Sequence, residues 1–174
     1  MIYQPSDDSY LLSEVLKQYL TKTKNKNKNI RIFDMGSGSG IQVETCIKAG
    51  FKNILCADVD EEVIKHLKSK DFNNLQTDLF SNIKKSEKFD LIIFNPPYLP
   101  EHKYDKEKDI TGGKKGCEVI IKFLIQAKSH LNKKGSILLL FSSFSQPKII
   151  LKKIKSLDFK PKLLSNKKLF FEEL

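Results

Sequence analysis

Arginine is almost absent from this chain: Arg31 is the only one among its 31 Lys and Arg residues. The lysines give the 174-residue chain a formal net charge of +10, which suggests a nucleic-acid or ribosomal partner. Arginine, however, is the residue usually used for bidentate contacts with phosphate or guanine. We therefore interpret much of the charge as biased composition, concentrated in a solvated Lys/Asn-rich linker at residues 22–29.

Long apolar runs and paired cysteines are also missing. The longest apolar runs, residues 91–94 and 137–141, are too short to span a bilayer, and no secretory signal follows Met1. The three cysteines are isolated and form no C-x-x-C pair, so neither a disulfide framework nor a metal site is predicted. We expect one cytoplasmic domain, residues 1–174, with buried or half-buried thiols.

The most informative segment is the tetrapeptide Asn95-Pro96-Pro97-Tyr98, which follows an apolar run typical of a buried strand. Two consecutive prolines have no backbone N–H, so this turn offers hydrogen-bond acceptors and almost no donors. The prolines also restrict the backbone around them, which fixes the Asn95 side chain and the Pro96 carbonyl. Rigid acceptors beside an aromatic ring suit a planar –NH2 group, such as a side-chain amide or the exocyclic amine of a base.

Strand-like and helix-like segments alternate along the chain, which predicts an α/β, Rossmann-like fold. We expect a seven-stranded, mostly parallel sheet with helices on both faces and an antiparallel strand at the C-terminus. The predicted strands are residues 30–33, 53–57, 72–77, 91–94, 136–141, 159–164 and 168–173. The predicted helices are residues 9–20, 41–49, 61–69, 119–131 and 148–157. An irregular, charged loop at residues 99–114 is expected on the substrate side.

Polar residues follow the first four predicted strands, at the point where each one ends. These residues are Asp34, Asp58, Asp78 and Asn95. In a doubly wound sheet, ligands bind outside the carboxyl ends of the strands, near the point where the strand order reverses. The four side chains are therefore expected to line one crevice.

A glycine-rich turn, Gly36-Ser37-Gly38-Ser39-Gly40, follows the first predicted strand. It differs from the dinucleotide fingerprint, because Ile41 stands where the third glycine of G-x-G-x-x-G would be. Asp34, just before the turn, would repel a pyrophosphate. A cofactor that carries positive charge and no phosphate fits better, and S-adenosylmethionine has an ammonium, a sulfonium, a ribose and an adenine.

On this interpretation each aspartate faces one part of the cofactor. Asp34 faces the ammonium, Asp58 accepts hydrogen bonds from the ribose hydroxyls, and Asp78 accepts from the adenine amine. The complete predicted cofactor site consists of Ser9, Asp34, Gly36, Ser37, Gly38, Gly40, Asp58, Val59, Asp78, Leu79 and Asn95.

Together these motifs resemble the class I S-adenosylmethionine-dependent methyltransferases, and within them the HemK family of protein glutamine N5-methyltransferases. Residues 2–10 are similar to the family's opening motif, with Gln4 and Asp7 where glutamate is commoner and Ser9 where threonine is commoner. Residues 112–116 look like the family's G-G-x-x-G, and N-P-P-Y is its catalytic motif. The chain resembles the small archaeal and eukaryotic branch, because it lacks the helical N-terminal domain of the bacterial enzymes.

The resemblance implies methylation of the glutamine in the Gly-Gly-Gln motif of a class I translation release factor, with S-adenosyl-L-homocysteine as the second product. Asn95, Pro96 and Tyr98 would be catalytic, and Pro97 would join them in binding the substrate. Members of this branch typically work as a heterodimer with a small zinc-binding activator, which would cover the edge of the third strand.

Three other functions are weighed against this one. An amino-methyltransferase acting on DNA or RNA also fits N-P-P-Y and the charge, but not the scarcity of arginine or the lack of a target-recognition domain. A nucleotide-dependent oxidoreductase fits the glycines but neither Ile41 nor Asp34. A scaffold without activity would not explain an intact N-P-P-Y.

Overall fold

The structure is a computed structural model that describes residues 2–24, 27, 29–99, 113–169 and 172–174. Within these residues a single five-stranded sheet runs in the order β3-β2-β1-β4-β5, and every neighbouring pair is parallel. The strands are β1 Ile32–Met35, β2 Ile54–Asp58, β3 Asn74–Gln76, β4 Phe89–Phe94 and β5 Leu131–Leu139. The helices are α1 Asp7–Lys24, α2 Ile41–Lys48, α3 Glu61–Ser69, α4 Glu118–His130 and α5 Pro147–Ser156.

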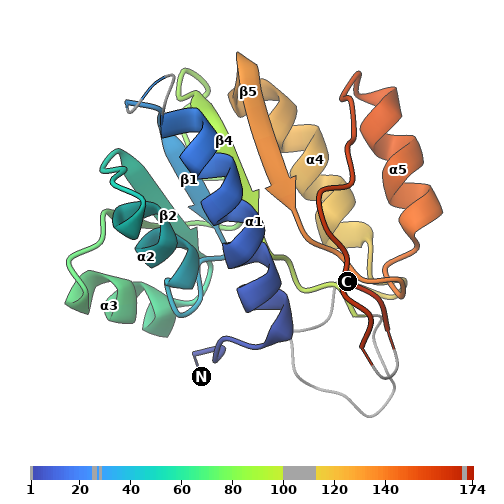
Figure 1. Cartoon of the computed structure of the whole chain (residues 1–174), viewed down its shortest axis with the longest axis horizontal. Helices are drawn as coiled ribbons and strands as arrows, with labels where there is room; N and C mark the ends of the chain where they lie inside the picture. The colour runs from blue at the N-terminus through green and yellow to red at the C-terminus, as the bar shows by residue number, and fades with distance from the viewer. Residues whose placement is uncertain (1, 25–26, 28, 100–112, 170–171) are drawn as a thin grey trace.

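The central strands β1 and β4 are apolar along most of their length because both of their faces are covered (Figure 1). Alternate residues point to opposite faces, so Ile32 and Leu91 pack in one cluster while Phe33 and Ile92 pack in another. Buried residues of α1, α2 and α3 belong to the first cluster, and those of α4 and α5 to the second. The chain is therefore a three-layer α/β fold, as the alternation in its sequence predicted.

The predicted seven-stranded sheet is wrong: the described residues form five strands, and none of the five is antiparallel. Residues 159–164 form no strand. In the last predicted strand, of which residues 170–171 lie outside the described part, the described residues make one isolated antiparallel bridge, Lys168 with Glu173. Residues 160–167 are exposed, so they lack the alternating burial that stabilises a strand. Pro161 within this segment also has no N–H to donate to a ladder.

Most other elements lie close to their predicted bounds, with three differences. α1 continues to Lys24, into the linker predicted at residues 22–29. β3 has only three residues, and β5 begins at Leu131, five residues before the predicted start at Ser136. Residues 100–112 of the predicted substrate-side loop lie outside the described part.

The cysteines are free and buried, in agreement with the prediction. Burial also raises the pKa of the Cys56 thiol to about 12. None of the helices in the described part of the chain is long and apolar enough to cross a membrane.

Candidate active site

In the order β3-β2-β1-β4-β5, successive strands extend the sheet in one direction from β1 to β3 and in the other from β4 to β5. The order therefore reverses between β1 and β4, which lie side by side in the sheet. Met35 of β1 is in register with Ala57 of β2 and with Phe94 of β4, so these three strands reach the same edge together. Asp34 and Asn95 thus lie at neighbouring strand ends, at the switch point where ligands bind in this fold class.

Asp34 is buried, with only 2% of its surface exposed, and its Oδ2 atom has no hydrogen-bond partner among the described residues. Burial raises the pKa of this carboxyl to about 7; a hydrogen bond with Ser37 lowers it in part, and the charge of Asp58 raises it further. A buried carboxylate oxygen is costly unless something pairs with it. An ammonium group would supply both the charge and the N–H donors that Asp34 lacks.

Asp58 is tied to the glycine-rich turn. The backbone N–H of Gly38 donates to Asp58 Oδ2 at 3.1 Å, and the N–H of Asp60 donates to Oδ1 at 3.1 Å. Burial raises the pKa of Asp58, although these N–H bonds oppose the shift. The carboxylate is therefore fixed beside the turn and retains lone pairs for a diol such as a ribose.

Ser37 holds the turn together instead of pointing into an open site. Its hydroxyl donates to the carbonyl of Asp34 at 2.9 Å and accepts from the N–H of Ala57 at 3.1 Å. Its own N–H donates to the carbonyl of Ala57 at 3.0 Å. The side chain thus clamps the ends of β1 and β2 to each other, and its predicted contact with the cofactor would have to share this hydroxyl.

Two of the three predicted glycines have different physical reasons to be glycine. A Cβ on Gly40 would come within 2.9 Å of the Phe72 ring, so close packing excludes a side chain there. A Cβ on Gly38 would meet only the Cβ of Tyr3, at 4.0 Å, so this side of the Gly38 backbone is not closely packed. At both positions φ is positive, a conformation that glycine adopts readily. Gly38 is the position at which a ligand could approach the backbone.

Asn95 is held by a residue of the first helix. Its Nδ2 donates to Asp8 Oδ2 at 3.0 Å, which assigns the orientation of the amide. Its Oδ1 is buried and has no partner among the described residues. The geometry leaves one acceptor of Asn95 free at the end of β4.

Tyr98 and Tyr3 both converge on the same carboxylate. The hydroxyl of Tyr3 donates to Asp8 at 3.1 Å, and the hydroxyl of Tyr98 donates to Asp8 Oδ2 at 3.4 Å. Burial raises the pKa of Tyr98, and the negative charges of Asp8 and Glu172 add to this effect. Pro96 is buried and Pro97 half-buried, so the N-P-P-Y turn is packed into the structure.

Four other residues predicted to bind the cofactor are Asp78, Val59, Leu79 and Ser9. Asp78 follows β3 and forms an ion pair with Lys122 of α4 at 2.9 Å, with 62% of its side chain exposed. Val59 is exposed, whereas Leu79 is buried and has a positive φ of 50°. Ser9 is buried and donates to Asp8 from its hydroxyl. No contact among the described residues joins Asp78 to Asp34 or Asp58.

Sequence reasoning missed Asp8, to which it assigned no role in the site. Asp8 is 4% exposed and accepts from four side chains or backbone groups of the site: the hydroxyls of Tyr3 and Tyr98, the amide of Asn95, and Ser9. α1 is anchored in this position by α2, because Gln42 Nε2 donates to the carbonyl of Ser9 at 3.0 Å. Asp8 belongs to the opening motif, residues 2–10, where it lies between Asp7 and Ser9.

Replacing Asp8 by asparagine tests its role as a positioning residue. Asp8→Asn keeps the volume but brings an NH2 group that competes with Asn95 Nδ2 as a donor, so the Asn95 amide loses its fixed orientation. We expect kcat for methyl transfer to fall by about tenfold or more while cofactor affinity changes little. Steady-state kinetics and calorimetric titration with the cofactor measure the two effects; an unchanged kcat would remove Asp8 from the site.

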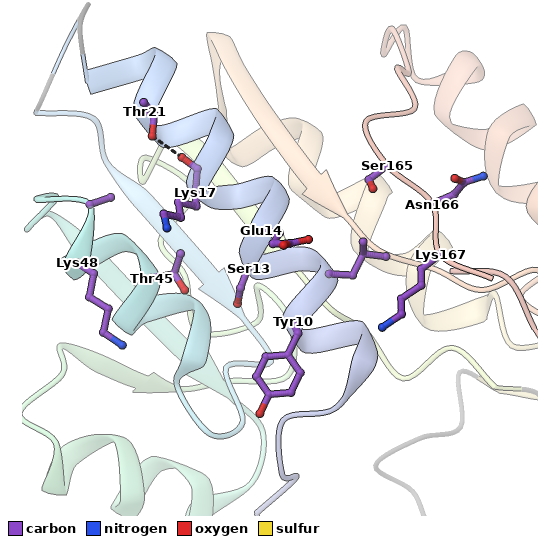
Figure 2. A pocket seen from close by; sticks show the side chains of 12 residues that line it. Tyr10, Ser13, Glu14, Lys17, Thr21, Thr45, Lys48, Ser165, Asn166 and Lys167 are labelled. Atoms are coloured by element: carbon purple, nitrogen blue, oxygen red, sulfur yellow. Dashed lines mark hydrogen bonds between the residues drawn. The ribbon is translucent and has the colours of Figure 1, made fainter. Parts of the chain in front are cut away.

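A separate groove lies along α1, between α2 and residues 165–167 (Figure 2). Figure 2 shows Tyr10, Ser13 and Lys17 along the helix, with Thr45 and Lys48 on the α2 side. It contains none of the predicted site residues, so we assign it no ligand.

Three features are those of a class I S-adenosylmethionine-dependent methyltransferase: a parallel sheet with this strand order, a buried carboxylate before a glycine turn that has no partner among the described residues, and an N-P-P-Y turn after the neighbouring strand. The methyltransferase small domain family matches residues 11–158. The chain therefore belongs to this family, and its enzymatic class is as the sequence predicted.

One curated relative covers nearly the whole chain. A protein of Methanocaldococcus jannaschii described as a "Putative protein N5-glutamine methyltransferase" is 35% identical over 99% of this chain and 88% of its own length. The resemblance to protein glutamine N5-methyltransferases inferred from the motifs is thus confirmed.

Two bacterial relatives match a smaller part. A release factor glutamine methyltransferase of Rhodopirellula baltica is 28% identical over 50% of this chain, and a ribosomal protein uL3 glutamine methyltransferase of Xanthomonas campestris pv. campestris is 31% identical over 49%. The matched regions cover 33% and 30% of those proteins.

Among solved structures, a ribosomal protein L11 methylase from Lactobacillus delbrueckii subsp. bulgaricus superposes with a TM-score of 0.70 at 19% identity, over 99% of this chain and 78% of that chain. A 16S rRNA methyltransferase of T. thermophilus, solved with AdoMet and guanosine, gives 0.63 at 20% identity, over 86% and 38%. These likenesses confirm the methyltransferase fold.

Proposed function

We propose that this protein methylates the side-chain amide nitrogen of a glutamine in a protein, and that its substrate is the Gly-Gly-Gln motif of a class I release factor. The observation that carries this proposal is the buried Oδ1 of Asn95, which has no hydrogen-bond partner among the described residues and whose amide is oriented by Asp8. The relatives described above support protein glutamine as the substrate class.

Asn95 Oδ1 and the Pro96 carbonyl can accept the two N–H bonds of a glutamine amide. An amide nitrogen is a poor nucleophile because its lone pair is delocalised into the carbonyl. Two fixed acceptors orient the –NH2 group and stabilise the positive charge that develops on nitrogen. Tyr98 is partly buried against both apolar clusters, and we expect its ring to pack against the flat amide and exclude water. No general base is required, since water can take the proton after transfer.

The residues at the ends of β1 and β2 fit S-adenosylmethionine. Asp34 would hold its ammonium, Asp58 its ribose, and Gly38 allows close approach of the backbone. When bound, this cofactor supplies a methyl group activated by a sulfonium. Asp34 and Asn95 lie on neighbouring strands, so the chain can hold the donor and the acceptor side by side.

We also infer that an activator subunit covers the β3 edge. β3 has three residues, Gln76 at its end is exposed, and Val59 beside it is 65% exposed. An unpaired strand edge of this kind is a template for addition of a further strand from a partner. A small zinc-binding subunit is the partner type that the sequence resemblance implies.

The test is transfer of labelled methyl groups from S-adenosylmethionine, with and without a candidate activator. The substrates are a class I release factor, its Gly-Gly-Ala variant, ribosomal protein uL3, and DNA and RNA. We expect label on the release factor alone, with higher activity when the activator is present. Label on uL3 alone would show that the substrate is uL3 and not the release factor. Label on nucleic acid would show that the methyl acceptor is the amine of a base and not glutamine. Full activity without an activator would contradict the inferred subunit.

A further inference from the structure

Among the described residues, three buried side-chain oxygens have no hydrogen-bond partner: Asp34 Oδ2, Asn95 Oδ1 and Glu172 Oε2. The first two belong to the groups already placed beside the cofactor and the amide. Glu172 belongs to neither, because it lies in the segment after α5. Leaving a carboxylate oxygen both buried and unpaired costs stability, so its retention points to a ligand.

The backbone around Glu172 is fixed by several hydrogen bonds. Lys167 and Leu174 donate to each other's carbonyls at 3.0 and 2.9 Å, and the Leu174 side chain is buried in the core. The N–H of Ser143, just after β5, donates to the carbonyl of Glu173 at 2.8 Å. Glu172 is therefore anchored on the β4–β5 side of the sheet, whereas Asp34 and Asp58 lie at the ends of β1 and β2.

Glu172 lies near the two tyrosines of the site, but neither supplies it with a hydrogen bond. Burial is the main cause of the raised pKa of Tyr3 and of Tyr98, and the negative charge of Glu172 adds to the rise in both. Each tyrosine hydroxyl has a single hydrogen, and both hydroxyls donate to Asp8. Among the described residues, therefore, neither tyrosine supplies the donor that Glu172 Oε2 lacks, and a bound peptide could supply it.

We propose that Glu172 binds the substrate by accepting hydrogen bonds from backbone N–H groups of the peptide next to the methylated glutamine. This inference rests on the proposed function and adds a specificity residue to it. Backbone N–H groups are present on both sides of any glutamine inserted into the N-P-P-Y turn. A carboxylate that accepts from them would select an extended peptide over a free amide.

Glu172→Gln is the test, because it removes the charge and keeps the size. Glu173→Gln is the matched control: it removes the same charge one residue away, where the Glu173 carboxylate accepts from Asn166 on the surface. Both variants and the wild type are assayed with the glutamine protein that the wild type methylates. Thermal unfolding and cofactor titration accompany the kinetics.

We expect Glu172→Gln to lower kcat/KM by about tenfold to a hundredfold, mainly through KM, since a hydrogen bond to a charged acceptor is lost. Its Tm should equal or exceed that of the wild type, because a buried unpaired charge is gone, and its cofactor affinity should not change. Glu173→Gln should remain within about twofold of the wild type. The opposite directions of activity and stability would distinguish substrate binding from a structural role.

Equal activity of the two variants would overturn the inference, as would a fall in Tm that parallels the loss of activity. An inactive wild type would overturn the proposed function and this inference together. An active wild type with an equally active Glu172→Gln would leave the proposed function intact.

Discussion

Asn95→Ala should abolish methyl transfer while S-adenosylmethionine still binds. The substitution removes the free Oδ1 acceptor at the end of β4, and it leaves the buried carboxylate of Asp34 in place. Loss of one preorganised group that stabilises developing charge typically costs about 100- to 1,000-fold in kcat. We expect a loss at least of this size, with cofactor affinity within about threefold of the wild type, measured by methyl-transfer kinetics and calorimetric titration.

The chain offers a matched control for this variant. Asn132 donates from Nδ2 to Asp90 Oδ1 at 2.7 Å, which repeats the Asn95–Asp8 pairing at the opposite end of the sheet. Asn132→Ala loses the same kind of bond and should keep full activity. Comparable losses in the two alanine variants would assign the effect to folding, and an active Asn95→Ala would refute the catalytic role of N-P-P-Y.

Asp34→Asn should destroy cofactor binding and at the same time stabilise the free protein above neutral pH. The pKa of Asp34 is raised from 3.8 in the unfolded reference to about 7 in the folded chain. The folded state therefore holds a proton that the unfolded state releases between these values, so stability falls as pH rises from about 4 to about 7. A shift of this size corresponds to about 4 kcal/mol.

The variant removes this penalty. The difference in unfolding free energy, Asp34→Asn minus wild type, should grow from near zero at pH 4 to its full value at pH 8. Urea titrations of both proteins across this range measure it, and the subtraction cancels other titrating groups. A difference in unfolding free energy that does not change with pH would show that ionisation of Asp34 does not destabilise the folded protein.

Cofactor binding gives the same group an opposite dependence on pH. An ammonium binds the ionised carboxylate, so wild-type affinity should weaken as the pH falls below about 7 and Asp34 takes up a proton. Raising the pH therefore lowers the folding stability of the free protein and increases its affinity for the cofactor. This is the behaviour expected of a site that holds an unpaired charge for its ligand.

The sequence predicted the site residues that come directly after the ends of strands. Asp34, Asp58 and Asn95 each come at the end of an apolar run, and parallel strands bring their carboxyl ends to one edge. It also predicted the free acceptor at Asn95, because two prolines leave few donors nearby.

Asp8 and Glu172 could not be found in the same way. Their roles depend on contacts between segments that lie far apart in the chain, and neither follows an apolar strand. The two extra strands were predicted from apolar residues near the C-terminus, but those residues include the exposed Leu163 and Leu164. An apolar sequence pattern predicts a strand correctly only when its apolar side chains are buried against another part of the protein.

The contacts that join α1 to the rest of the site have a consequence for the order of folding. Asp8 pairs with Asn95 and Tyr98 across 87 and 90 residues, and Lys167 pairs with Asp7 across 160. Closing such long loops costs entropy that short-range pairs such as β1–β2 avoid. Refolding chains should therefore regain their circular dichroism signal before they regain methyl-transfer activity.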